Sequence, residues 1–180
     1  MMKATGIVRR IDDLGRVVIP KEIRRVLRIR EGDPLEIFTS KEGEVIFKKY
    51  SPINELSTFA DEYCQALFKV SGHNCFVTDK DNVVAYAGQG RREIMDKLIS
   101  VQCEKIMNSR MPFIASSMKE PQQLISDSAV PRLVIAQPII AEGDVCGLIG
   151  FLETPDKKIT ETEEKLISTA AIFLGKQMEA

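Results

Sequence analysis

The chain of 180 residues has no tryptophan, one histidine, four cysteines and no long apolar run. Its cysteines stand too far apart for a CxxC pair, so the sequence offers no clustered ligands for zinc. No segment approaches the roughly 20 apolar residues that span a bilayer, and the first residues lack the apolar stretch of a signal peptide. We therefore expect no metal, no membrane partner and a cytoplasmic location.

The single histidine, His73, leaves little material for acid–base catalysis, because histidine is the commonest proton-transfer residue. One enzymatic interpretation is a cysteine-based reductase, which would need paired, accessible thiols. Cys75 and Cys146 lie in apolar segments typical of buried strands. We interpret them as reduced core residues, and we expect neither an enzyme nor a bound cofactor.

Positive charge is concentrated at the start of the chain. Residues 1–50 contain 12 Lys and Arg against 8 Asp and Glu, a net charge of +4, and residues 1–30 contain 9 against 3. The other 130 residues hold 13 basic and 18 acidic side chains, a net charge of −5. This asymmetry favours a polyanion-binding module joined to a domain of another kind.

Short alternating segments predict a small unit over residues 1–50. We expect strands at 5–11 and 16–19 around a turn, a helix at 20–28, and a hairpin of strands at 35–39 and 44–48. Pro20 suits the first helical position because its φ is fixed and its missing N–H is not needed there. A unit of this size, without disulfide or metal, has a marginal core. We therefore expect two copies to form one core jointly.

A linker is expected at residues 51–55, followed by a second domain at 56–180. Apolar residues from Ile53 to Val70 repeat at steps of three and four, which fits a helix lying on its own sheet or a helix joining two subunits. Next we expect strands at 74–79 and 83–88, a helix at 91–110, a loop-rich stretch at 111–131, strands at 132–141 and 144–153, and a last helix. Thr160 and Glu163 form a predicted capping box at its start. The chain as a whole is therefore of the α+β class.

The predicted helix at residues 20–28 carries like charges four residues apart. Lys21 with Arg25, and Arg24 with Arg28, are each unfavourable by about 0.3 kcal/mol in an isolated helix. An anionic partner would offset this repulsion, and duplex DNA is such a partner because bound arginines release its counterions. Arginine also makes bidentate contacts with phosphate or guanine. A solvated basic face without a partner is the alternative interpretation.

Several motifs in the first unit follow one another in an order known from one family. They are Gly6-Ile7-Val8-Arg9, Asp12 to Gly15-Arg16-Val17-Val18-Ile19-Pro20, Glu22-Ile23-Arg24-Arg25 and Gly32-Asp33 to Leu35-Glu36-Ile37. In this order they resemble the AbrB/MazE-type swapped-hairpin DNA-binding family. The resemblance implies that two chains interleave their hairpins into one small β-barrel and that double-stranded DNA is the partner. It also implies that DNA is contacted by Arg9, Arg16, Arg24 and Arg25.

The arrangement of the whole chain resembles sporulation regulators in which a GAF-type sensor domain follows this module. That resemblance implies a homotetramer, control of late sporulation genes by activation and repression, and association with the nucleoid. GAF domains often hold a small ligand beneath a loop, and Phe76, Tyr86 and Phe113 are candidate pocket residues that fit a plain core equally well. The alternative function is an antitoxin-type binding module, although toxin partners normally bind a disordered tail.

Overall fold

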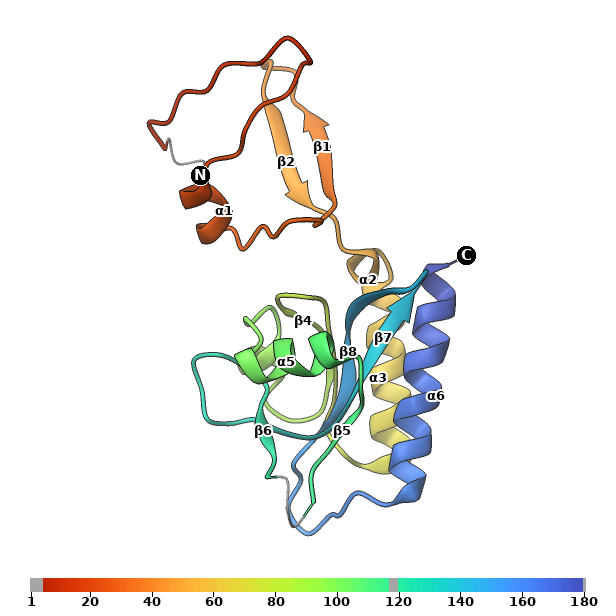
Figure 1. The fold of residues 1–180 in the computed structure, drawn as a ribbon. Coiled ribbons are helices and arrows are strands. Elements are labelled where there is room, and N and C mark those ends of the chain that lie inside the picture. Colours follow the sequence, from red (N-terminus) through yellow and green to blue (C-terminus); the bar gives the residue numbers. More distant parts are fainter. Residues whose placement is uncertain (1–4, 117–119, 180) are drawn as a thin grey trace. The chain divides into compact units, whose positions relative to one another are not determined.

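The computed structural model describes residues 5–116 and 120–179, which divide into two units after Tyr50 (Figure 1). The first unit contains α1 (Lys21–Val26), β1 (Leu35–Thr39) and β2 (Val45–Lys49). The helices of the second unit are α2 (Pro52–Glu55), α3 (Ser57–Ser71), α4 (Arg91–Ile94), α5 (Val101–Ser109) and α6 (Glu161–Met178). Its strands are β3 (Cys75–Thr78), β4 (Val83–Ala87), β5 (Phe113–Ile114), β6 (Gln122–Gln123), β7 (Arg132–Ala141) and β8 (Asp144–Leu152).

The strands expected at residues 5–11 and 16–19 are not formed, which corrects the sequence-based prediction. The predicted turn between them is present, because the Asp12 N–H donates to the Arg16 carbonyl at 3.0 Å and the Gly15 N–H to the Asp12 carbonyl at 3.0 Å. Gly15 closes it with φ +77°, a conformation that side chains disfavour. Beyond this turn residues 5–11 and 16–18 are exposed, and neither segment pairs with a strand of the described chain.

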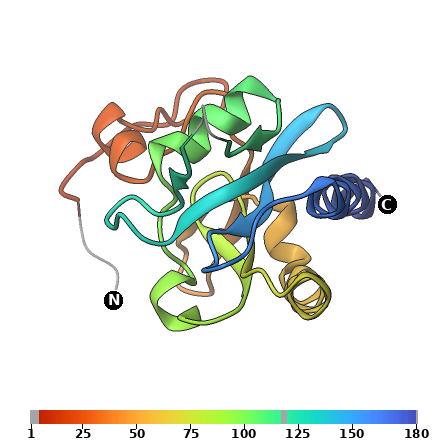
Figure 2. The same ribbon diagram turned by 90° about the horizontal axis from the view of Figure 1, so that it is seen from below.

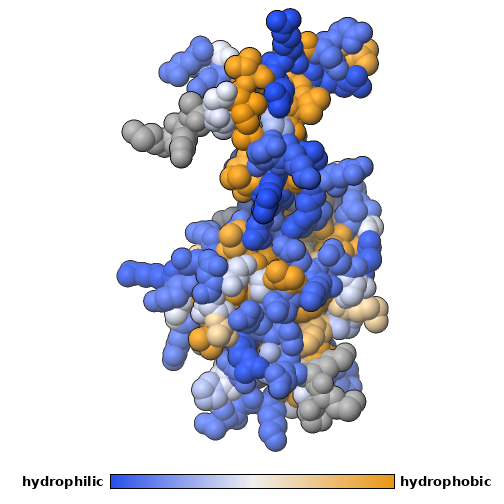
Figure 3. Space-filling model, turned by 60° about the vertical axis from the view of Figure 1, so that its left-hand side comes forward, coloured by the Kyte–Doolittle hydropathy of each residue, from blue (hydrophilic) through white to orange (hydrophobic). Residues whose placement is uncertain are grey.

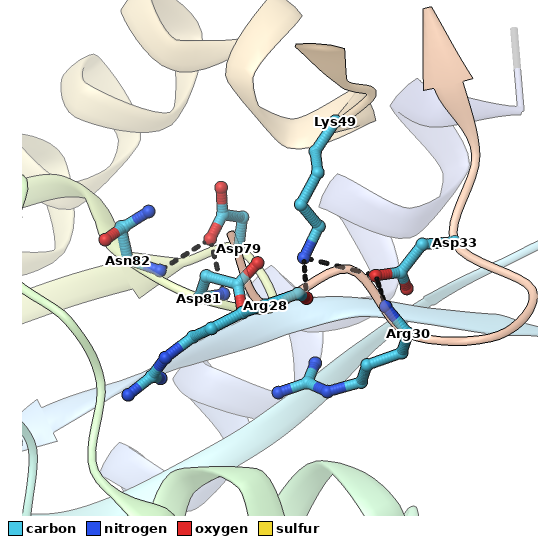
Figure 4. A network of polar contacts seen from close by, with 7 residues as sticks. All are labelled: Arg28, Arg30, Asp33, Lys49, Asp79, Asp81 and Asn82. Carbon is cyan, nitrogen blue, oxygen red and sulfur yellow. Dashed lines mark hydrogen bonds and ion pairs between the residues drawn. The ribbon is translucent and has the colours of Figure 1, made fainter. Parts of the chain in front are cut away.

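The predicted helix after Pro20 is present as α1, which ends two residues earlier than expected. Arg28 follows in the left-handed region with φ +52°, and the Ile29 N–H donates to the Arg24 carbonyl at 2.8 Å. The Lys49 ammonium lies 3.0 Å from the Arg28 carbonyl and 3.2 Å from the Asp33 carboxylate (Figure 4). These contacts fix the end of α1 against β2.

The predicted hairpin is confirmed, with β1 antiparallel to β2 and Ile37 opposite Phe47. Neither face of this hairpin is covered within the chain: Ile37 is 61% exposed, Phe47 44% and Val45 60%. Hydrophobic side chains are accordingly visible at the surface of the first unit (Figure 3). Among residues 5–50 no hydrophobic residue is buried, and the Asp33 side chain, 6% exposed, is covered at its ion pair with Lys49. A unit without a buried hydrophobic residue has no core of its own, so its stability needs another surface.

The second unit is built on a sheet with strand order β4-β3-β8-β7-β5, and β6 also pairs with β7. Helices α3 and α6 lie side by side on one face, and α5 covers the other (Figures 1 and 2). The capping box at the start of α6 is formed as predicted, with Thr160 and Glu163 bonded reciprocally. Near the other end of α6, the backbone of Gly175 approaches the Ile140 carbonyl so closely that a Cβ would clash. This close approach lets α6 lie directly on β7.

The two faces of the sheet have separate apolar cores. One core joins α3 and α6 to the sheet through residues such as Ile53, Leu67 and Leu174, and the other joins α5 through residues such as Phe76 and Leu148. The apolar repeat that begins at Ile53 is therefore partly buried and partly exposed. Ile53, Ala60 and Leu67 face the core, whereas Val70 is 75% exposed. Within the chain, the helix lies on its own sheet.

Two expected boundaries differ from the structure. Residues 51–55 belong to the second unit, because Pro52 starts α2 and Ile53 is only 1% exposed. The single helix expected at 91–110 is interrupted between α4 and α5, where Asp96 has φ +60°. Main-chain bonds replace helical ones there: the Asp96 N–H donates to the Val83 carbonyl, and the Val83 N–H to the Lys97 carbonyl, each at 3.0 Å. None of the helices in the described ranges is sufficiently long and apolar to cross a membrane.

His73 is a buried residue just after the end of α3, and its titration should make the stability of the protein depend on pH. It is 2% exposed, stacks on Phe151 with ring centroids 5.4 Å apart, and its Nδ1 has no hydrogen-bond partner among the described residues. Burial lowers the pKa of His73 below its ordinary value, and the positive charge of Lys157 lowers it further. The folded protein therefore binds this proton less readily than the unfolded chain does.

We expect the free energy of unfolding to fall as the pH drops below the unfolded histidine pKa of 6.5, towards the lower pKa of the folded state. Since His73 is the only histidine, His73→Phe should lessen the difference in urea stability between about pH 7.5 and about pH 5.5. An equal loss of stability in both proteins over this interval would assign the effect to other groups.

Candidate nucleic-acid interface

The arginines singled out in the sequence lie on two elements of the first unit. Arg9 and Arg16 flank the turn at residues 12–15, and Arg24 and Arg25 lie in the last turn of α1. All four side chains belong to exposed residues. Basic residues near a helix C-terminus are favoured by the helix dipole, so their position also suits α1 itself.

Arg24 and Arg25 have no acidic partner among the described residues, and neither has Arg9, whose guanidinium donates to the Val8 carbonyl at 3.2 Å. Their charge is therefore not neutralised within the chain. Exposed guanidinium groups that are left unpaired can bind phosphate oxygens and release counterions. The arrangement suits an anionic surface rather than an uncharged small molecule.

Arg16 differs from the other three because it is paired. Its Nε lies 2.8 Å from Oδ2 of Asp12, and its backbone N–H donates to Oδ1 of Asp12 at 2.7 Å. The same Oδ1 accepts from the Leu14 N–H at 3.1 Å. The backbone and side chain of Arg16 hold the pKa of Asp12 below its usual value, so this carboxylate stays ionised at neutral pH.

The sequence places Asp12 in the turn and in one of the motifs of the family resemblance, but it gives no role to the Asp12 side chain. The available signal was its spacing: an aspartate four residues before an arginine, with Gly15 between them, closes a hairpin turn and brings both side chains together. The sequence likewise gives no role to Lys49, because its partners Asp33 and Arg28 are distant in sequence.

The polar contacts described in the second unit, such as those of Asp79 with the Asp81 and Asn82 N–H groups and of Arg91 with Asp61, link its own elements. Phe76 and Tyr86 are buried in its core, and Phe113 packs against them, so the candidate pocket residues serve as packing. The four cysteines are free and buried, and burial raises the pKa of the Cys103 thiol to about 11. In the described parts of the chain, no three His, Cys, Asp or Glu side chains converge on a possible metal position. Thiol chemistry is disfavoured here, since the reactive form is the thiolate.

Comparison with known proteins places the chain in a family. A family model described as "Stage V sporulation protein T C-terminal, transcription factor" matches residues 55–179. The chain is also 49% identical over 178 residues to stage V sporulation protein T of Bacillus subtilis (strain 168), covering 99% of both chains. The protein belongs to the stage V sporulation protein T family.

The first unit has relatives of its own. A model described as "Antidote-toxin recognition MazE, bacterial antitoxin" matches residues 8–54. The transition state regulatory protein AbrB of Bacillus subtilis (strain 168) is 49% identical over 73 residues, which are 41% of this chain and 67% of AbrB. The expected AbrB/MazE resemblance is thereby confirmed.

Solved structures show the fold of the second unit. The GAF domain of an Acinetobacter phosphoenolpyruvate-protein phosphotransferase matches with a TM-score of 0.55 at 11% identity, covering 73% of this chain and 84% of that one. A free methionine-R-sulfoxide reductase from Thermoplasma acidophilum matches with a TM-score of 0.54 at 15% identity, covering 70% and 94%. At such identities these likenesses concern the fold alone. The α+β class and the GAF fold are confirmed.

Proposed function

We propose that the protein is a transcription regulator that binds double-stranded DNA through Arg9, Arg16, Arg24 and Arg25 of its first unit. The observation that carries this proposal is the set of exposed arginines on a unit without a core, three of them lacking any acidic partner in the described chain. Membership of a transcription-factor family supports it. Catalysis has no place in this function.

The exposed apolar side chains of the first unit support a homodimer as the DNA-binding form. Val8, Val18, Val26 and Val45 are each at least 60% exposed. A second copy can cover these side chains and pair with the extended segments at residues 5–11 and 16–19, which gives the interleaved β-barrel expected from the sequence. Each arginine is then present twice on one surface.

The second unit supports joining of two such dimers into a tetramer. Phe59, Tyr63 and Phe173 form an aromatic cluster between α3 and α6, with ring centroids 5.6 to 6.2 Å apart. Next to it Ile172 is 63% exposed. Two linked dimers can bind neighbouring DNA sites with a raised effective concentration. The role of the GAF-type domain is then oligomerisation, together with any ligand sensing.

Removal of the second unit, residues 51–180, should therefore weaken DNA binding without abolishing it. We expect a dimer of residues 1–50 whose affinity for a fragment with two neighbouring sites is about 100-fold lower than that of the full chain, because the avidity is lost. Anisotropy titrations on one-site and two-site fragments measure this difference. Equal affinity of both proteins for the two-site fragment would contradict a tetrameric DNA reader.

The name of the full-length relative suggests the process: we infer control of late sporulation genes, by activation of some and repression of others. The test is a pair of measurements, binding of the purified chain to promoter fragments and transcript levels in a sporulating strain that lacks the gene. Bound promoters should gain or lose transcription late in sporulation. Binding without such changes in transcription would mean that the protein binds DNA but acts in another process.

An antitoxin function is the second candidate, because the family model that matches residues 8–54 describes antitoxins. The chain continues after that unit into a folded domain with two apolar cores rather than into a disordered tail. Co-expression separates the two functions: relief of growth inhibition caused by a neighbouring toxin gene would favour the antitoxin.

A further inference from the structure

We propose that Asp12 positions Arg16 to read the edge of a guanine base, whereas the unpaired arginines bind phosphates. This inference rests on the proposed DNA-binding function and divides its arginines into two kinds. It concerns the one exposed arginine among the four whose charge is balanced by a carboxylate within the chain.

In this geometry the two terminal nitrogens of the Arg16 guanidinium remain available for binding. Asp12 engages the Nε of the guanidinium at 2.8 Å, and no described group bonds to its two terminal nitrogens. The side chain of Arg16 is 69% exposed, against 37% for Asp12. Two parallel N–H groups with a fixed direction match the O6 and N7 acceptors of guanine in the major groove. The carboxylate that binds Nε thus orients the guanidinium group and leaves its two terminal nitrogens for contact with a base.

Charge favours a base over a phosphate at this position. The Asp12–Arg16 pair has no net charge, so it gains little from the phosphate backbone and its counterions. Base edges are uncharged, and recognition there depends on hydrogen-bond geometry, which the pair retains. Arg24 and Arg25 lack such a partner among the described residues and keep their full charge for phosphates.

The turn makes the pair rigid. Oδ1 of Asp12 accepts the Leu14 and Arg16 N–H groups at 3.1 and 2.7 Å, while Oδ2 binds the guanidinium. The backbone bonds of Asp12 with Arg16 and Gly15 close the hairpin around them. An arginine held at both its backbone and its Nε has less conformational entropy to lose on binding a base.

Asp12→Asn is the sharpest variant, because an asparagine oxygen can still accept the two backbone N–H groups while its NH₂ group cannot accept from the Arg16 Nε. In the full chain we expect discrimination between promoter and unrelated DNA to fall about tenfold. Binding to unrelated DNA should strengthen and become more salt-dependent, because each site gains a positive charge. Arg24→Ala, in contrast, should weaken binding to both DNAs and reduce the salt slope.

The base contact itself is tested with promoter DNA in which 7-deazaguanine replaces guanine, since this base lacks N7. We expect the replacement to reduce wild-type affinity about tenfold and to leave Arg16→Ala, already weakened, nearly unchanged. The same loss in both proteins would overturn the inference. So would unchanged discrimination by Asp12→Asn at unchanged oligomer size.

Two further measurements keep the outcomes distinct. Arg16→Lys retains the positive charge but not the two parallel N–H donors of the guanidinium group. It should therefore lose discrimination between promoter and unrelated DNA as Asp12→Asn does, and it provides the test even if Asp12→Asn folds poorly. Failure of the wild-type chain to bind any duplex would refute the proposed function together with this inference. Wild-type binding that does not depend on guanine N7 would refute this inference alone.

Discussion

Replacement of Arg24 by alanine should lower the affinity for promoter DNA at least about 100-fold while leaving the oligomer intact. A charge-assisted hydrogen bond contributes about 1.5–3 kcal/mol, and a dimer loses two of them. Arg24 is exposed in α1 and contacts no acidic group in the described chain, so its loss should leave the unit folded. Anisotropy titration gives the affinity, and light scattering gives the mass.

Lys41→Ala is the matched control for Arg24→Ala. It removes the same charge from the exposed turn between β1 and β2, away from α1, and we expect less than about a threefold change in affinity. Equal losses in both variants would mean that only the total charge matters. Loss of the oligomer in Arg24→Ala would instead make this arginine structural.

Replacement of Ile37 by aspartate should dissociate the first units and abolish DNA binding. Ile37 is 61% exposed in the single chain, beside Phe47 across the hairpin. In the proposed dimer both side chains are covered, so the variant loses about 1.5–3 kcal/mol of burial per chain and places a charge in an apolar core. Sedimentation velocity of residues 1–50 carrying the substitution should show monomers.

Val130→Asp controls for the chemistry of this change, because Val130 is 66% exposed in a loop of the second unit. Introduced into the full chain, it should change neither mass nor DNA affinity, whereas Ile37→Asp in the full chain should lose binding. A dimer of residues 1–50 that survives Ile37→Asp would exclude the hairpin faces from the dimer core.

Local sequence signals predicted the parts of the fold that depend on neighbouring residues. Pro20 marked the start of α1, the capping box marked the start of α6, and the hairpin of β1 and β2 followed from alternation and a glycine turn. The burial of Cys75 and Cys146 also followed from their apolar segments.

Features that depend on tertiary contacts were not visible in the sequence. The break between α4 and α5 arises because Asp96 bonds to Val83 of β4, which no helical periodicity reveals. The segments at residues 5–11 and 16–19 have a strand-like pattern, but they pair with no strand of the described chain, and such pairing depends on tertiary contacts. Composition and motifs indicate the arginines, but the pairing that separates Arg16 from Arg24 is visible only in the structure.

The salt dependence of DNA binding tests the central claim most directly. If two copies of four arginines neutralise about eight phosphates, the logarithm of the affinity should fall with the logarithm of salt concentration at a slope near −7, which is about a 10⁴-fold loss between 50 and 200 mM. If Arg16 contacts a base instead, the slope should be near −5. A flat response, or no binding at the lowest salt, would contradict DNA recognition by these arginines.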